Sequence, residues 1–292
     1  MNLMNKTIGE ALAEGKERLR AAGKEAYCLE AELLLEEAAQ LDHLSLYMQE
    51  NEVLPQEAAE RYEMYLFERE MGRPAQYIIG QWEFMGLPFA VGEGVLIPRP
   101  DTEILVEIIL QKQKDEPLKS ILDIGTGSGC IPVSLSFYGT FEEILAVDIS
   151  QLALAYARKS AIQNGASIKF YESDLFSDVP IEYKGKLDAI VSNPPYIPRA
   201  EIETLMIEVR GYEPWEALDG GEDGLDFYRR IIREGRDWLR EDGWLFFEIG
   251  YNEKDAVIAL MEESGFVEIS AQKDFAGLDR VVCGKRGRTE EA

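Results

Sequence analysis

Residues 120–284 contain seven short segments rich in β-branched and aromatic residues, and helical patterns lie between them, notably over 151–163 and 226–239. The seven segments are SILDIG (120–125), EILAVDI (143–149), IKFYES (168–173), LDAIVSN (187–193), WLFFEIG (244–250), VEISAQ (267–272) and RVVCG (280–284). Parallel strands need long crossover connections, which are usually helices that cover both faces of the sheet. The alternation therefore predicts an α/β fold with a mostly parallel, seven-stranded sheet.

The segment before this alternation has a helical period. Ile8, Leu12 and Leu19 mark one apolar face, residues 26–41 repeat leucine and alanine at helical spacing, and Pro55 suits the start of a further helix. From residue 76 onward, β-rich residues interrupted by glycines favour a hairpin connector. We therefore expect a helical domain over 1–74, a hairpin connector over 75–100, an α/β domain over 101–285 and a loose tail over 286–292.

The helix expected after the connector has the sequence RPDTEILVEIILQKQK. Either Asp101 or Thr102 has a side chain suited to capping its N-terminus.

Composition excludes several classes of function. The chain carries 55 acidic against 30 basic residues, a net charge of −25, so bare nucleic acid is a poor partner. It has one histidine, His43, which removes most Ser-His-Asp, Cys-His and histidine–metal chemistry. Its three cysteines are widely spaced and form no CxxC pair, so we expect neither a disulfide framework nor a metal site. No apolar run approaches the roughly 20 residues that span a bilayer, and we expect a cytoplasmic protein.

The sequence LDIGTGSGC predicts a strand, a glycine-rich turn and a helix. Gly125, Gly127 and Gly129 have no Cβ, so the backbone can turn sharply and approach a ligand closely. The spacing G-x-G-x-G differs from the dinucleotide fingerprint G-x-G-x-x-G, and the lysine of a P-loop is missing. Ser128 is one position away from that of a G-x-S-x-G nucleophile elbow.

Three aspartates accompany this turn at the ends of successive strands. Asp123 precedes the first glycine, Asp148 closes the second strand and Asp174 follows the third. Each could merely cap a turn, but the ordered set favours a nucleoside lying across the carboxyl ends of the strands. Asp148 would accept the ribose hydroxyls and Asp174 would meet an adenine amino group. The set resembles the cofactor site of Rossmann-like S-adenosylmethionine-dependent methyltransferases, and the glycine spacing disfavours the competing oxidoreductase.

The fourth strand ends abruptly at Asn193, Pro194, Pro195 and Tyr196. The prolines make the turn rigid and keep Asn193 out of the α region. Two fixed acceptors, the Asn193 side-chain oxygen and a nearby backbone carbonyl, would match a planar NH₂ group whose face the tyrosine ring covers. Holding both protons would stabilise the positive charge that builds on this nitrogen during methyl transfer. The motif resembles both DNA amino-methyltransferases and glutamine amide methyltransferases.

Three further segments narrow the resemblance: GRPAQYIIGQWEFMGLPFAVGEGVLIPRPDTEILVE, YEPWEALDGGEDGLDFYRRII and DFAGLDRVVCGK. With DIGTGSGC and SNPPYIP, they are similar to the bacterial peptide-chain-release-factor glutamine methyltransferases from about residue 72 to 284. The family implies methyl transfer from S-adenosylmethionine to the glutamine of a Gly-Gly-Gln loop in a release factor. It implies that the N-terminal helices choose the protein partner.

The resemblance also implies roles for individual residues. The cofactor-binding set is Gly125, Thr126, Gly127, Ser128, Gly129, Asp148, Asp174, Leu175 and Asn193. The catalytic set is Asn193, Pro194 and Tyr196. The substrate-binding set is Asn193, Pro194, Pro195, Tyr196 and Arg99. Arg99 could instead order the Asn193 turn, and DGGEDGLD is expected to form a turn before a helix because it lacks the ligand pattern of a calcium loop.

Alternatives remain open at this stage. A glutamine methyltransferase of a ribosomal protein would use the same amide site. An adenine methyltransferase acting on DNA is disfavoured by the acidic composition. A regulator that binds the cofactor without catalysis is disfavoured by the intact Asn-Pro-Pro-Tyr turn.

Overall fold

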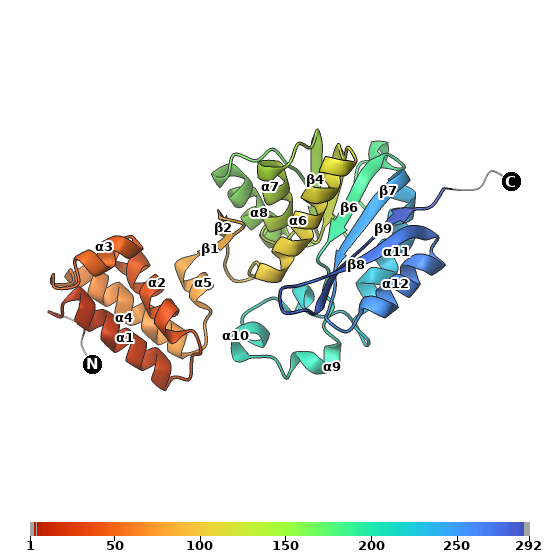
Figure 1. Ribbon diagram of the computed structural model, residues 1–292. Coiled ribbons are helices and arrows are strands. Elements are labelled where there is room, and N and C mark those ends of the chain that lie inside the picture. The colour runs from red at the N-terminus through yellow and green to blue at the C-terminus, as the bar shows by residue number, and fades with distance from the viewer. Residues whose placement is uncertain (1–2, 4, 289–292) are drawn as a thin grey trace. The chain divides into compact units, whose positions relative to one another are not determined.

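The computed structural model describes residues 3 and 5–288 (Figure 1). The chain forms two compact units. The helical unit comprises residues through Gln81 together with Met206–Tyr212, and the sheet unit comprises Trp82–Leu205 and the residues from Glu213 onward. No helix in the described part of the chain is both long and apolar enough to cross a membrane.

The helical unit is built from short helices with well-defined ends. They are α1 (Ile8–Ala21), α2 (Tyr27–Ala39), α3 (His43–Met48), α4 (Gln56–Glu70), α5 (Ala75–Ile79) and α10 (Ile207–Arg210). Thr7 begins α1 with a capping box, because its side chain accepts from the Glu10 N–H and Glu10 bonds back to the Thr7 N–H. Ile8, Leu12 and Leu19 are buried, as the helical spacing predicts.

The segment Met206–Tyr212 joins this unit from a distant part of the sequence. The Glu208 carboxylate accepts hydrogen bonds from Lys24 Nζ at 2.7 Å and from Arg69 Nη1 at 3.1 Å. Arg69 also forms a two-pronged ion pair with Glu30. These contacts provide hydrogen-bond partners for the buried Arg69 and Lys24. Burial alone would raise the pKa of Glu208, but the hydrogen bonds from Lys24 and Arg69 lower it to about 2.

The sheet unit contains the predicted seven-stranded sheet. Its order is β5-β4-β3-β6-β7-β9-β8, parallel from β5 to β7 and antiparallel at β9 and β8. The strands are β3 (Ser120–Ile124), β4 (Glu143–Asp148), β5 (Lys169–Glu172), β6 (Leu187–Ser192), β7 (Leu239–Glu248), β8 (Phe266–Lys273) and β9 (Asp279–Arg286). The order reverses between β3 and β6, which makes their carboxyl ends the switch point of the fold.

Helices cover both faces of this sheet (Figure 1). One face packs against α6 (Pro100–Asp115), α7 (Cys130–Tyr138) and α8 (Gln151–Gln163), and the other against α11 (Asp226–Trp238) and α12 (Lys254–Glu263). Ile121 faces the first set of helices, whereas Leu122 and Ile124 face the second. This alternation with a period of two is the reason that a continuous apolar run can form a strand buried on both sides.

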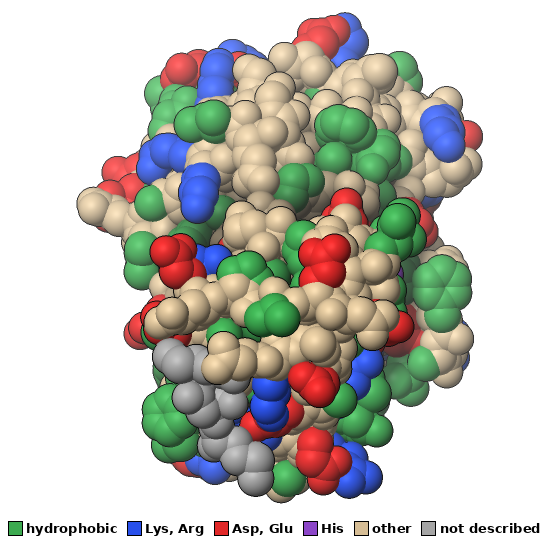
Figure 2. All heavy atoms as spheres, turned by 90° about the vertical axis from the view of Figure 1, so that its left-hand side faces the viewer, with side chains coloured by type: hydrophobic (Ala, Val, Ile, Leu, Met, Phe, Trp, Pro, Cys, Tyr) green, Lys and Arg blue, Asp and Glu red, His purple; other side chains and the backbone are tan. Residues whose placement is uncertain are grey.

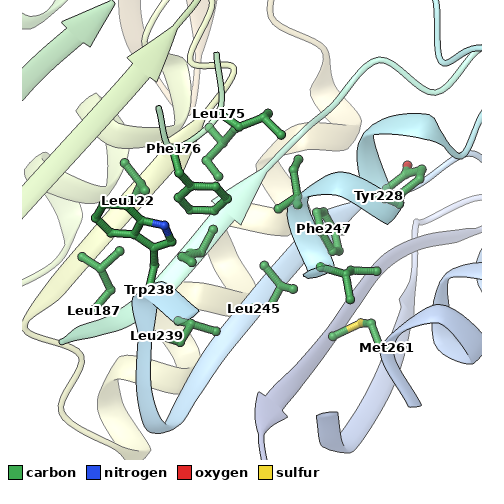
Figure 3. Close-up of a cluster of buried hydrophobic side chains, with 14 of the residues drawn as sticks. Leu122, Leu175, Phe176, Leu187, Tyr228, Trp238, Leu239, Leu245, Phe247 and Met261 are labelled. Carbon is green, nitrogen blue, oxygen red and sulfur yellow. The ribbon is translucent and has the colours of Figure 1, made fainter. Parts of the chain in front are cut away.

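The core beneath α11 and α12 is rich in aromatic residues (Figure 3). Phe176 stacks on Trp238 with ring centroids 5.6 Å apart, and Tyr228 meets Phe247 edge-on at 5.2 Å. The Tyr228 hydroxyl donates to the Glu248 backbone carbonyl at 2.9 Å. This cluster therefore fixes α11 against the carboxyl end of β7.

Segments outside the main sheet differ in part from expectation. The predicted hairpin is present as β1 (Gln81–Phe84) and β2 (Leu87–Ala90), but residues 75–79 before it form α5. The expectation that Asp101 or Thr102 caps α6 is wrong, since the helix begins at Pro100 and both residues lie in its first turn. Proline suits this position because it has no N–H to leave unsatisfied.

Short helical turns complete the sheet unit: α9 (Arg199–Ile202), η1 (Ile181–Tyr183) and η2 (Trp215–Ala217). At the C-terminus, β9 runs through Arg286, and Arg288 forms an ion pair with Asp242 at 2.7 Å. The remainder of the predicted tail, residues 289–292, lies outside the described residues.

Candidate active site

A cavity of about 640 Å³ lies at the carboxyl ends of the central strands. Its wall comes from the loops that follow β3, β4, β5 and β6, from the segment before α6, and from one side of α11. This volume is within the range of pockets for drug-sized molecules. The position agrees with the rule that open α/β sheets bind ligands at the point where strand order reverses.

The glycine turn forms the floor of this cavity. Gly125 and Gly127 have φ of 71° and 55°. A Cβ added at Gly125 would meet nothing within 4 Å, and one at Gly127 would meet only Val95 at 3.8 Å. Gly129 serves a different purpose, because a Cβ there would lie 3.1 Å from Ala157 of α8. The first two glycines therefore leave space on the ligand side, and the third permits close packing of the helices.

Asp148 holds the glycine turn in place. One carboxylate oxygen accepts from the Gly127 N–H and the other from the Ser150 N–H, each at 2.9 Å. Burial raises the pKa of Asp148, while these backbone N–H groups act in the opposite direction. Each oxygen has a second lone pair. The carboxylate, which lines the cavity, can therefore accept further hydrogen bonds from a ligand.

Asp123 lies beneath the turn rather than in the cavity wall. Its carboxylate is buried, and within the described chain neither oxygen has a hydrogen-bond partner; the Thr126 hydroxyl also lacks one. Burial raises the pKa of Asp123 to about 7 and the nearby Asp148 charge adds to this, while the Thr126 hydroxyl, which is close by but outside hydrogen-bond geometry, acts in the opposite direction. Unsatisfied buried polar groups are costly and are concentrated at functional positions.

The far wall of the cavity combines apolar and charged side chains. Leu175 has φ of 52° and is buried, and it lines the cavity with the exposed Ile149. Asp174 also lines the cavity, where both of its oxygens lie 2.9 Å from Arg230 Nη2. The wall can therefore contact a flat, apolar ring and present a carboxylate at its edge.

The Asn193 turn forms another part of the cavity wall. Asn193, Pro194 and Pro195 all line it. The Asn193 amide nitrogen donates to Thr102 Oγ1 at 3.1 Å, and the Thr102 hydroxyl donates to Glu248 Oε2 at 2.6 Å. Thr102 and Glu248 are buried. A chain of hydrogen bonds thus connects the half-buried Asn193 to a carboxyl group inside the sheet unit.

Tyr196 lies behind this turn and is not among the residues that line the cavity. Its ring packs against the core beneath α11, and its hydroxyl donates to Glu248 Oε1 at 3.4 Å. Burial raises the pKa of Tyr196 above its ordinary value, and repulsion from Glu248 adds to this effect. Tyrosine here is a neutral donor.

The sequence DGGEDGLD supports the turn from outside. A Cβ at Gly220 would lie 2.7 Å from Tyr196 Cα, and one at Gly224 would lie 2.5 Å from the Tyr196 carbonyl oxygen. The backbones are joined by bonds from Ile197 N–H to Leu218 O and from Gly220 N–H to Ile197 O. Glycine is required because the two segments pack backbone to backbone.

Arg99 lines the cavity and is anchored by Glu213. Arg99 Nη2 donates to both carboxylate oxygens of Glu213, at 2.6 and 2.8 Å. Burial raises the pKa of Glu213, and Arg99 opposes this shift. The pair fixes the segment before α6 against the YEPWEAL segment.

Several residues at the site were not identified from the sequence. Ile149, Phe227, Arg230 and Ile231 line the cavity, and Glu248 and Thr102 support Asn193. Ile149 directly follows Asp148 at the end of β4, and this position next to the predicted ribose acceptor could have indicated that it lines the cavity. Throughout residues 3 and 5–288, no group of three or more His, Cys, Asp or Glu side chains is placed to hold a metal ion.

Comparison with known proteins identifies related families and a shared fold. Family models described as "PrmC N-terminal domain" and "Methyltransferase small domain" match residues 10–80 and 100–209. A methyltransferase structure from Pyrococcus furiosus shares the fold, with a TM-score of 0.54 and 17% identity over 78% of this chain and 99% of that one.

Two curated relatives match almost end to end. Proteins named release factor glutamine methyltransferase from Clostridium botulinum and Geobacter sulfurreducens are 39% and 40% identical over 281 residues. Each alignment covers 96% of this chain, with 99% and 97% of the relatives. The chain therefore belongs to the family of release factor glutamine methyltransferases.

Proposed function

We propose that this chain transfers a methyl group from S-adenosylmethionine to the side-chain amide nitrogen of the glutamine in the Gly-Gly-Gln loop of peptide chain release factors. The near end-to-end similarity to proteins named for this activity supports the reaction class. The observation that carries the proposal is the Asn193 amide, which is anchored at its nitrogen and lines the cavity that the glycine turn also lines.

The cavity fits S-adenosylmethionine in its size and in the groups that line it. Gly125 and Gly127 leave a cradle that any side chain would fill, and Thr126 and Ser128 line it beside them. Asp148 keeps lone pairs for two ribose hydroxyls. Ile149 and Leu175 would hold the adenine ring, and Asp174 would accept from its amino group. When bound, the cofactor supplies an electrophilic methyl group on a sulfonium.

The residues of the Asn193 turn would prepare the acceptor nitrogen. An amide NH₂ is a weak nucleophile because its lone pair is delocalised into the carbonyl. The Asn193 side-chain oxygen and a backbone carbonyl of the turn would accept its two protons, which favours a pyramidal nitrogen and stabilises the developing positive charge. Positioning supplies much of the remaining acceleration, since effective molarity accounts for roughly 7–11 kcal/mol of a barrier.

The remaining assignments follow from this reaction. Pro194 and Pro195 hold the backbone acceptor, and Tyr196 supports the turn from the core side, since its ring does not line the cavity and so does not cover the amide as the sequence suggested. Arg99 assists substrate binding from the cavity wall. Residues 1–74 recognise the release factor, residues 75–100 connect the helical domain to the α/β domain, and residues 101–285 carry out the transfer in the cytoplasm. Neither a metal ion nor direct binding of nucleic acid is needed.

The test is to incubate the protein and radiolabelled S-adenosylmethionine with release factor, total ribosomal proteins and duplex DNA in separate reactions. We expect label on release factor, confined by peptide mapping to the Gly-Gly-Gln glutamine. A release factor with this glutamine changed to alanine is the control and should stay unlabelled. Label on a ribosomal protein or on adenine, with release factor unlabelled, would overturn the proposal.

A further inference from the structure

Glu248 is a buried carboxyl group next to the turn that carries Asn193. It ends β7, and the strand pairing places Phe247, its neighbour, opposite Ser192, the residue before Asn193. Its side chain is 1% exposed and bonds to Thr102 at 2.6 Å and to Tyr196 at 3.4 Å. A group buried at this depth needs a reason, because an ionised carboxylate loses its hydration there.

The hydrogen bonds around Thr102 have one consistent direction when Glu248 is ionised. A carboxylate can only accept, so the single Thr102 hydroxyl proton is directed at Glu248 Oε2. Thr102 Oγ1 can then only accept from Asn193, which places the NH₂ end of the Asn193 amide toward Thr102. The Asn193 oxygen does not take part in this chain of hydrogen bonds and can accept from a group bound in the cavity that Asn193 lines.

We propose that Glu248, acting through Thr102, fixes the orientation of the Asn193 amide so that its oxygen faces the substrate NH₂. Both are positioning residues, and the inference rests on the proposed function because it needs Asn193 to accept a substrate proton. An unanchored amide can rotate by half a turn and present its own NH₂, a donor that repels the substrate NH₂ and removes the acceptor.

The relay reverses when Glu248 takes up a proton. A protonated Glu248 can donate to Thr102, whose hydroxyl proton is then directed at Asn193 and favours the rotated amide. Burial raises the pKa of Glu248 to about 7, and Asp101 on α6 acts in the same direction. The hydrogen bond from Thr102, the charge of Arg280 on β9 and the Tyr196 hydroxyl oppose this shift.

Two other groups face the same carboxyl. Tyr228 of α11 donates a hydrogen bond to the backbone carbonyl of Glu248. The Cys130 thiol of α7 interacts electrostatically with the Glu248 carboxylate, and burial raises the pKa of this thiol to about 12. Tyr228 also bonds Glu253 at 3.2 Å, and burial raises the pKa of Glu253 and that of Asp123 to about 7. Of these three carboxyl groups, Glu248 is the one that bonds Thr102. The ionised form, which anchors Asn193, is therefore lost as pH falls through about 7.

The first test compares Thr102→Val with Thr102→Ser. Valine keeps the branched shape and removes the hydroxyl, whereas serine keeps the hydroxyl. We expect Thr102→Val to lower kcat on the order of 10- to 100-fold, with the Kd for S-adenosylmethionine nearly unchanged, while Thr102→Ser retains most of the activity. Equal activity of the valine and wild-type proteins would overturn the relay.

The second test is the pH profile of kcat, which a purely structural role would not change. The wild-type protein should lose activity below an apparent pKa near 7. Glu248→Gln cannot titrate, and its NH₂ can donate to Thr102 as the protonated acid does. Its kcat should therefore be lowered and should lack the part of the acid limb that belongs to Glu248, while a limb from Asp123, whose pKa is also about 7, persists. An unchanged acid limb in Glu248→Gln would contradict the inference.

A third variant separates this inference from the proposed function. If Asn193→Ala is nearly as active as the wild type, the role of Asn193 itself fails, and the relay fails with it. If Asn193→Ala is inactive while Thr102→Val and Glu248→Gln behave as the wild type at every pH, only the relay fails. Thermal unfolding of each variant confirms that the compared proteins are folded.

Discussion

At the scale of single residues, the side chains that line the site are held in position by hydrogen bonds to other residues of the protein. Asn193 is held by a hydrogen bond to Thr102. Asp148 accepts hydrogen bonds from two backbone N–H groups, those of Gly127 and Ser150, and so fixes the loops that line the cavity. Such preorganisation matters because groups that already point at the developing charge need not reorganise during the reaction.

Replacing Asn193 tests the acceptor directly. Asn193→Ala should lower kcat roughly 10²–10³-fold, the cost of removing one preorganised hydrogen-bond partner from a transition state. Tyr196→Phe should be milder, because it keeps the ring in the core and loses only a 3.4 Å bond to Glu248. Turnover is measured with labelled cofactor at saturating release factor. Near-normal turnover of Asn193→Ala would exclude the proposed role.

Replacing Asp148 tests the cofactor site. Asp148→Ala should weaken binding of S-adenosylmethionine about 10-fold or more, since it removes the ribose acceptor and leaves the Gly127 N–H without its partner. Calorimetry measures the Kd, with Asp255→Asn on the exposed surface of α12 as the matched control. Unchanged affinity in Asp148→Ala, or tight binding of NAD to the wild type, would contradict the assignment.

At the scale of elements, the seven strands could be predicted because buried parallel strands are short, continuous apolar runs with helices between them. The start of α6 could not, because the proline at its first position competes with Asp101 and Thr102 as boundary signals, and the local sequence does not decide among them. The cavity-facing loops were predictable where glycine or aspartate marks them. Ile149 and Glu248 were not, since an apolar or acidic residue at a strand end has no distinctive signature.

The DGGEDGLD loop is the element that most directly supports the Asn193 turn. Gly220→Ala should lower kcat, because its Cβ would lie 2.7 Å from Tyr196 Cα and must displace the turn. Cofactor affinity should remain close to that of the wild type, because Gly220 does not line the cavity. Steady-state kinetics and calorimetry measure the two quantities, with the exposed Glu222→Ala of the same loop as the control. Wild-type kinetics of Gly220→Ala would show that the turn does not depend on this packing.

At the scale of the whole molecule, pairing across long stretches of sequence limits what can be predicted. Met206–Tyr212 follows the Asn193 turn in sequence but belongs to the helical unit, where Glu208 meets Lys24 and Arg69. A single sequence gives no indication of such a partner nearly two hundred positions away. The overall charge of the chain, by contrast, can be read directly from the sequence. It predicts how the protein associates with its substrate.

The excess of acidic residues leads to the last prediction. The net charge is −25, and acidic and basic side chains are interspersed on the face drawn in Figure 2. A release factor must place its Gly-Gly-Gln loop against ribosomal RNA, so we expect basic residues around that loop. Opposite charges steer two proteins together, and salt screens them, with a Debye length of about 8 Å at physiological ionic strength and about 3 Å at 1 M.

We therefore expect kcat/KM for release factor to fall several-fold, on the order of 10-fold, between low and high salt. The value of kcat at saturating release factor should change little, because the Thr102 and Glu248 side chains that hold Asn193 are buried and shielded from added ions. Steady-state methylation across a series of salt concentrations separates the two quantities. If kcat/KM is independent of salt, charge does not guide the encounter, and recognition must depend on apolar contacts that salt does not screen.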